Sequence, residues 1–225
     1  MEHRNPLLPD VTSQKFITFG EIMLRLTPPN YEKIRVATSF EASYGGSEAN
    51  IALALANLGI DSTFFSVVPN NSLGKSAVRM LRSNDVHCTP VILSTPEETP
   101  THRLGTYYLE TGYRIRPSKV TYDRKHSAIT EYDFSKVDLD ALLAGFNWLH
   151  LSGITPALSP SCADFILACI KKAKESPPPT RSMISRPLYS LDCQISPSAQ
   201  QMAFQSLTVA VFTVLRVVAT TLKLG

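Results

Sequence analysis

Two adjacent glycines, Gly45 and Gly46, stand directly before an apolar repeat in the segment YGGSEANIALALANLG at positions 44–59. Glycine has no side chain, so the main chain at these positions can come close to another group. The free N–H groups at a helix N-terminus suit oxyanions and hydroxyls. The pair therefore predicts either a main-chain contact surface for a ligand or only a tight turn from a strand into a helix.

Common nucleotide and metal motifs are absent from the sequence. No GxGxxG follows the first predicted strand and no GxxxxGK[ST] occurs, so neither a dinucleotide site nor a P-loop is supported. His102, His126 and His150 have no cysteine or acidic partners at metal-ligand spacing, and we interpret them as structural. The four cysteines form no CxxC pair, so we expect buried free thiols in a reducing compartment and predict no metal site.

The glycine pair lies between a predicted sheet and a predicted helix. Residues 15–26 are typical of a strand that breaks and resumes, and residues 32–45 show the short alternation of a half-exposed sheet. Beyond the pair the pattern becomes helical, with Ile51, Leu55 and Leu58 on one stripe. This helix should end at a C-terminal cap glycine.

The chain then continues to alternate between strands and helices. We predict a strand at 62–68, a helix at 71–85, a hairpin at 102–122, a short helix at 138–146, a strand at 147–154 and a helix at 159–175. In the hairpin, Tyr107 and Tyr108 should point to opposite faces because neighbours on a strand alternate. This order of elements favours an α/β fold with a mostly parallel sheet covered by helices.

Composition limits the partners and divides the chain. The formal net charge of +3 is too small to indicate nucleic acid or an anionic membrane, and residues 1–176 are neutral overall. After Ser176 the sequence turns rich in Pro and Ser, and then runs apolar at 207–222 around Arg216. That run is short for a membrane span and its arginine opposes insertion. No apolar secretory signal precedes residue 15, so we expect a cytoplasmic protein.

The segment at 44–59 resembles the N-terminal signature of the ribokinase-like, PfkB-type carbohydrate kinases, although Pro69 stands where that family usually has a further glycine. FGEIMLRLTPP, VTYDRKHSAIT and WLHLSGITPALS are similar to segments of 2-keto-3-deoxygluconate kinases. The resemblance covers about residues 15–176. It implies a ribokinase-like three-layer sandwich, with a mostly parallel sheet and a small β lid at about 21–44 and 103–125, truncated in this chain.

The resemblance also implies ATP- and Mg²⁺-dependent phosphoryl transfer to a hydroxyl of a sugar acid such as 2-keto-3-deoxygluconate. The residues that it places against the substrate are Gly45, Gly46, Asn50, Tyr107, Tyr122 and Arg124. The chemistry is suitable, because a guanidinium can hold a carboxylate through two hydrogen bonds and tyrosine hydroxyls can fix the remaining oxygens. The alternatives stay open that the asparagine faces solvent and that the tyrosines only pack across the hairpin.

The sequence has no counterpart of the segment that performs catalysis in such kinases. In such kinases the phosphate-binding helix begins with Gly-Ala-Gly-Asp, whose aspartate is the base, and this chain contains neither that element nor any Gly-x-Gly-Asp. Asp192, the single carboxylate after Glu175, is a poor candidate. We therefore predict no catalytic residue, no encoded ATP site and an inactive chain. Residues 177–225 are interpreted as a divergent tail that arose from a frameshift, a splice variant or a gene-model error.

Two alternatives to an enzyme of the kinase family remain open. The chain could act as a truncated sugar-binding module, with the exposed edges of the lid hairpin pairing it to another copy as a homo-oligomer. It could also be a non-functional fragment that folds poorly, because a parallel sheet is normally covered on both faces.

Overall fold

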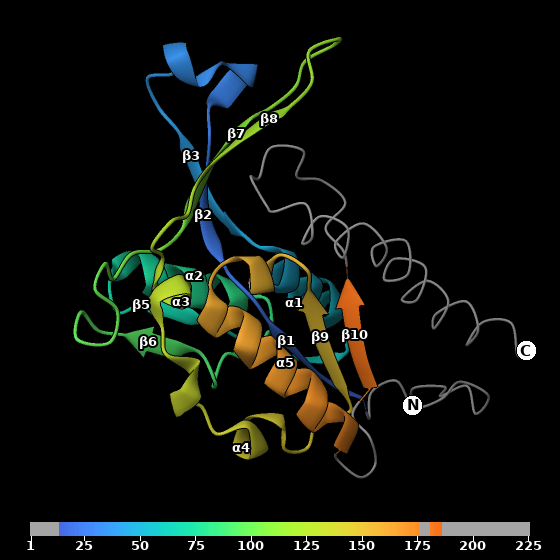
Figure 1. Ribbon diagram of the computed structural model, residues 1–225. Coiled ribbons are helices and arrows are strands. Elements are labelled where there is room, and N and C mark those ends of the chain that lie inside the picture. Colours follow the sequence, from blue (N-terminus) through green and yellow to red (C-terminus); the bar gives the residue numbers. More distant parts are fainter. Residues whose placement is uncertain (1–13, 176–180, 186–225) are drawn as a thin grey trace, which may run out of the picture.

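The body of the protein is built on a four-stranded parallel sheet. The computed structural model describes residues 14–175 and 181–185, and its sheet has the order β10-β9-β1-β4. The strands are β1 (Lys15–Phe19), β4 (Asp61–Phe65), β9 (Trp148–Ser152) and β10 (Arg181–Ser185). All three pairings are parallel, and a short parallel pair, β5 (Val67–Pro69) with β6 (Ile92–Ser94), extends the fold to one side (Figure 1).

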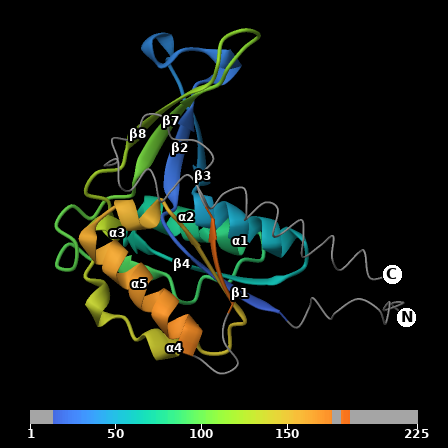
Figure 2. The same cartoon turned by 45° about the vertical axis from the view of Figure 1, so that its right-hand side comes forward.

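Helices cover both faces of this sheet (Figure 2). One face carries α1 (Ser47–Asn57) and α2 (Ser72–Arg82), and the other carries α5 (Pro160–Glu175) with the short helices α3 (Ala128–Glu131) and α4 (Leu139–Leu143). The neighbouring residues Phe64 and Phe65 show the division, because the first packs with the α1 side and the second with the α5 side. The predicted three-layer α/β fold is confirmed.

Local signals set the helix ends. The side chain of Asn71 accepts hydrogen bonds from the main-chain N–H groups of Leu73 and Gly74, at 3.0 and 3.1 Å, and so caps α2. Helix α5 begins at Pro160, as predicted, and Gly59 follows α1 with a φ of +75°.

The predicted apolar stripe of α1 was wrong in part. Leu55 is buried as predicted, but Leu58 is 65% exposed, and the side that packs against the sheet also contains Glu48 and Ala52. The inner face is therefore rotated away from Leu58, toward the side of the helix that contains Glu48 and Ala52. An acidic residue is thereby carried into the core.

A second sheet rises as a lid from the carboxyl end of β1 (Figure 1). Its strands have the order β3-β2-β7-β8 and are β2 (Met23–Thr27), β3 (Glu41–Gly45), β7 (Thr106–Glu110) and β8 (Lys119–Asp123). The predicted hairpin is confirmed as the antiparallel pair β7–β8. Within the alternating segment 32–45, a strand forms only from Glu41 onward, and Ile34–Val36 form a 3₁₀ turn.

Three cysteines, Cys88, Cys162 and Cys169, are buried free thiols, as the sequence predicts. The fourth, Cys193, lies outside the described residues, as does the predicted tail apart from β10, which pairs in parallel with β9. Across residues 14–175 and 181–185, no helix has the length and apolarity needed to cross a membrane.

Candidate functional site

The lid meets the body where the Tyr107 side chain of β7 reaches Gly45, the last residue of β3, close to the start of α1. A Cβ atom placed on Gly45 would lie 2.8 Å from the Tyr107 hydroxyl and 3.8 Å from Oδ1 of Asn50. Asn50 is exposed on the first turn of α1. A hydroxyl, an amide and a side-chain-free stretch of main chain therefore meet at the carboxyl edge of the parallel sheet, where open α/β sheets bind their ligands.

A second tyrosine extends this surface along the lid. Tyr122 is the cross-strand partner of Tyr107, with ring centroids 5.8 Å apart. Burial raises the pKa of Tyr107, while the nearby Arg25 guanidinium acts in the opposite direction. The phenol therefore stays protonated at neutral pH and can donate a hydrogen bond. Tyr108 occupies the other face of the lid, where its ring lies 5.9 Å from that of Phe40, as the alternation predicts.

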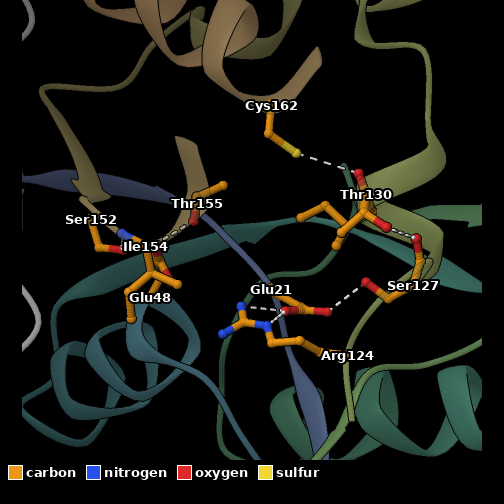
Figure 3. A network of polar contacts seen from close by, with 10 residues as sticks. Glu21, Glu48, Arg124, Ser127, Thr130, Ser152, Ile154, Thr155 and Cys162 are labelled. Carbon is orange, nitrogen blue, oxygen red and sulfur yellow. Dashed lines mark hydrogen bonds and ion pairs between the residues drawn. The ribbon is translucent and has the colours of Figure 1, made fainter. Parts of the chain in front are cut away.

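The guanidinium of Arg124 lies beside Tyr122 but points to a protein carboxylate. Its carbon is 5.5 Å from the centre of the Tyr122 ring, and its Nε donates to Oε2 of Glu21 at 2.8 Å (Figure 3). Glu21 is only 4% exposed and also accepts a hydrogen bond from Ser127 at 2.7 Å. The arginine predicted to hold a substrate carboxylate is therefore already in an ion pair.

Gly46 has a packing reason that applies without any ligand. A Cβ atom on this residue would lie 2.0 Å from the main-chain oxygen of Glu21, so no larger residue fits there. The structure thus brings together five of the six residues that the resemblance placed against a substrate: Gly45, Asn50, Tyr107, Tyr122 and Arg124. Their contact with a substrate stays a prediction.

A second buried carboxylate lies close to the first. Glu48, 2% exposed, accepts hydrogen bonds from Ser152 and from Thr155, the latter at 2.7 Å (Figure 3). These hydroxyls come from the carboxyl end of β9 and the turn after it. Burial raises the pKa of Glu48, and the two hydroxyls lower it in part. The contacts join the start of α1 to the strand at the centre of the sheet.

Comparisons with known proteins agree with this arrangement. Residues 13–197 match the sequence profile described as the pfkB family carbohydrate kinase. The chain belongs to this family. The match continues past residue 176, where the composition changes.

Several relatives of this pfkB-family chain have specific names. It is 35% identical over 164 residues to a 2-dehydro-3-deoxygalactonokinase of Haloferax volcanii, covering 72% of this chain and 49% of that protein. It is 32% identical over 149 residues to a 2-dehydro-3-deoxygluconokinase of Bacillus subtilis, covering 66% and 44%. The chain therefore spans about half the length of the curated relatives it matches.

Solved structures show the same ribokinase-like fold. The 2-dehydro-3-deoxygluconokinase of Thermotoga maritima matches with a TM-score of 0.71 and 40% identity, over 79% of this chain and 52% of that one. A pfkB family carbohydrate kinase from Listeria grayi matches with a TM-score of 0.75 and 32% identity, over 84% and 56%.

Sequence reasoning missed Glu21, Arg25 and Glu48 in this pfkB-family chain. Glu21 follows the apolar strand β1 almost directly, and polar residues at the carboxyl ends of parallel strands are candidates for any site. Glu48 stands four residues before Ala52 on the inner face of α1, so a correct helical stripe would have predicted its burial. Arg25 follows from strand alternation within β2, since it shares a face with Met23 and Thr27.

Proposed function

We propose that residues 15–176 form the substrate-binding half of an ATP-dependent kinase that phosphorylates a hydroxyl of a sugar acid of the 2-keto-3-deoxygluconate class. The observation that carries this proposal is the meeting of Tyr107 and Gly45 from the lid with Asn50 from helix α1 of the body. Three kinds of hydrogen-bonding group converge there from two strands of the lid sheet and from a helix of the body. Relatives whose names refer to the 2-dehydro-3-deoxy sugar acids support the choice of substrate.

These groups suit a polyhydroxylated ligand. The neutral phenol of Tyr107 can donate to a sugar oxygen, and the amide of Asn50 can both donate and accept. Gly45 has no side chain of its own, so its main chain can come close to a ligand that lies beside Tyr107. Holding the acceptor hydroxyl in one orientation is a large part of what a phosphoryl-transfer enzyme must supply.

The described residues do not fit ATP and Mg²⁺. Glu21 is paired with Arg124, and among the described residues no group of three or more His, Cys, Asp or Glu side chains could hold a metal ion. Glu48 is buried with two hydroxyl partners. No Gly-x-Gly-Asp occurs in the sequence to supply a base. We therefore propose that nucleotide and metal bind to structure that this chain does not encode, and that the chain alone does not turn over.

Titration calorimetry of the purified chain tests the binding half of the proposal. We expect heat of binding with 2-keto-3-deoxygluconate and much less with ribose, which lacks a carboxylate. An absence of heat with the sugar acid overturns the proposed function. Incubation with ATP, Mg²⁺ and the sugar acid tests the second part, because formation of ADP above a blank overturns the proposed inactivity of the chain.

A further inference from the structure

The lid carries two arginines on the side that faces the body, and their charges are compensated differently. Arg25 on β2 is in register with Ser43 on β3 and with Tyr107 on β7. Tyr107 is in register with Tyr122, so these four residues form one row across one face of the lid sheet. A Cβ atom on Gly45, which would lie 2.8 Å from the Tyr107 hydroxyl, would also lie 3.8 Å from the amide oxygen of Asn50 on α1, so this row is on the face that meets the body.

Arg124 is not available to a ligand without a penalty. Its Nε and Nη2 atoms both contact Oε2 of Glu21, and the two side chains are 15% and 4% exposed. Ser127 holds the other oxygen of Glu21. If Arg124 turned to a ligand, it would leave a buried carboxylate without a counter-charge, which is among the most costly changes in a protein interior.

Arg25 has no such partner. Its Nε donates to the hydroxyl of Ser43 at 2.8 Å, and the guanidinium also hydrogen-bonds to the hydroxyl of Tyr107, so it is fixed in the row by two uncharged partners. Among the described residues no acidic side chain forms an ion pair with Arg25, including Glu41 on the same face of the lid. Its charge is felt at Tyr107, whose pKa it lowers against the effect of burial.

We infer that Arg25, rather than Arg124, receives the carboxylate of the sugar acid and determines that the site prefers an acid to a neutral sugar. The inference rests on the proposed function and assigns the part of the site that recognises charge. Arg124 is then a positioning residue, which ties the end of β8 to Glu21 at the end of β1. The arginine fork suits a carboxylate because it presents parallel N–H donors.

The test compares 2-keto-3-deoxygluconate with its methyl ester, which keeps the shape but not the charge. Binding of both ligands is measured by calorimetry on the wild-type chain and on Arg25→Gln. We expect Arg25→Gln to weaken binding of the acid by about tenfold to a hundredfold, the range of hydrogen bonds to charged groups, and to leave binding of the ester within about twofold. Arg25→Lys should restore part of the preference for the acid.

Two control variants separate this role from others. Arg35→Gln removes the same charge from an exposed turn of the lid and should leave the preference unchanged. The double variant Glu21→Gln/Arg124→Gln removes both charges of the buried pair, so it avoids an unpaired carboxylate. It should keep the preference for the acid over the ester.

The outcomes that overturn the inference can be told apart. Equal weakening of acid and ester by Arg25→Gln assigns Arg25 a structural role only, and loss of the preference in the double variant assigns the carboxylate to Arg124. Either result overturns the inference while the wild-type chain still binds the acid, and so leaves the proposed function standing. Failure of the wild-type chain to bind either ligand overturns both.

Discussion

The region around Glu21 and the region around Glu48 place the same side chain at the same edge of the sheet in two different ways. Both carboxylates are almost completely buried. Glu21 has a cation, Arg124, and one hydroxyl, whereas Glu48 has two hydroxyls and no direct ion pair among the described residues. The first region is held by charge and joins the lid to the body. The second is held by neutral hydrogen bonds and joins α1 to β9.

The difference explains what each region can contribute. A charged pair loses most when one member is removed, because the other stays buried and uncompensated. A buried carboxyl whose pKa is raised by burial loses most when it is forced to ionise. Mutations and pH should therefore act on the two regions separately.

The largest effect is expected from Arg124→Gln. This change leaves Glu21 buried without a counter-charge and should lower the free energy of unfolding by about 3–5 kcal/mol. Arg103→Gln is the matched control, since Arg103 pairs with Asp123 at the same end of β8 but with side chains 34% and 57% exposed. It should cost only about 0–1 kcal/mol. Urea unfolding measures both, and equal costs would contradict the importance of the buried pair.

The glycine pair should separate into a structural and a binding position. A Cβ on Gly46 meets the main-chain oxygen of Glu21 at 2.0 Å, so Gly46→Ala must shift the backbone and should destabilise by about 1–3 kcal/mol. A Cβ on Gly45 meets the end of the Tyr107 side chain, which can turn away. Gly45→Ala should therefore change stability less but weaken binding of the sugar acid.

Thermal unfolding and calorimetry on the two variants distinguish these roles. If Gly46→Ala unfolds at the wild-type temperature, the close contact with Glu21 does not matter to the fold. If Gly45→Ala binds the sugar acid as well as the wild type does, the main chain at Gly45 does not contact the sugar acid.

The Glu48 region should respond to pH. Burial raises the pKa of Glu48 above its ordinary value of 4.5, so the unfolded chain releases this proton at a lower pH than the folded protein does. The unfolded state then binds fewer protons, and the stability from this group is lost as pH rises above about 4.5 toward the raised pKa. Each unit of difference in pKa corresponds to about 1.4 kcal/mol.

Glu48→Gln removes this titration while keeping an oxygen that can accept from Ser152 and Thr155. The variant should gain stability over the wild type as pH rises, and the gap should close near pH 4. Melting temperatures across this range measure the effect. A gap that stays constant with pH would show that Glu48 does not ionise differently in the folded and unfolded states.

Local patterns were enough to predict much of the fold. The start of α5 at Pro160 follows from adjacent residues, and so does the hairpin that places Tyr107 and Tyr122 together with Tyr108 on the other face. Such features depend on strand alternation and helix capping, which act within a few positions of the chain.

The buried acids could not be predicted in the same way. Glu21 and Arg124 are 103 positions apart, and Glu48 and Thr155 are 107 positions apart. The free-energy cost of burying a carboxylate is offset only by partners that the folded sheet brings near. The residues adjacent in the sequence do not identify those partners. The ion pair of Arg124 with Glu21 could not be predicted for the same reason, because the resemblance carries a residue type without its neighbours.

The smallest effect is expected from the loss of one hydroxyl, in Tyr107→Phe. If the phenol donates to the sugar, its removal should weaken binding by about 0.5–1.5 kcal/mol, or about twofold to tenfold. Tyr108→Phe is the matched control, because it removes the same group from the next residue on the opposite face of the lid. Neither variant should change the melting temperature greatly, since both rings keep their packing. Equal affinities in the two variants would mean that the face of the lid in contact with Gly45 does not bind the ligand, which would also remove the basis for a role of Arg25.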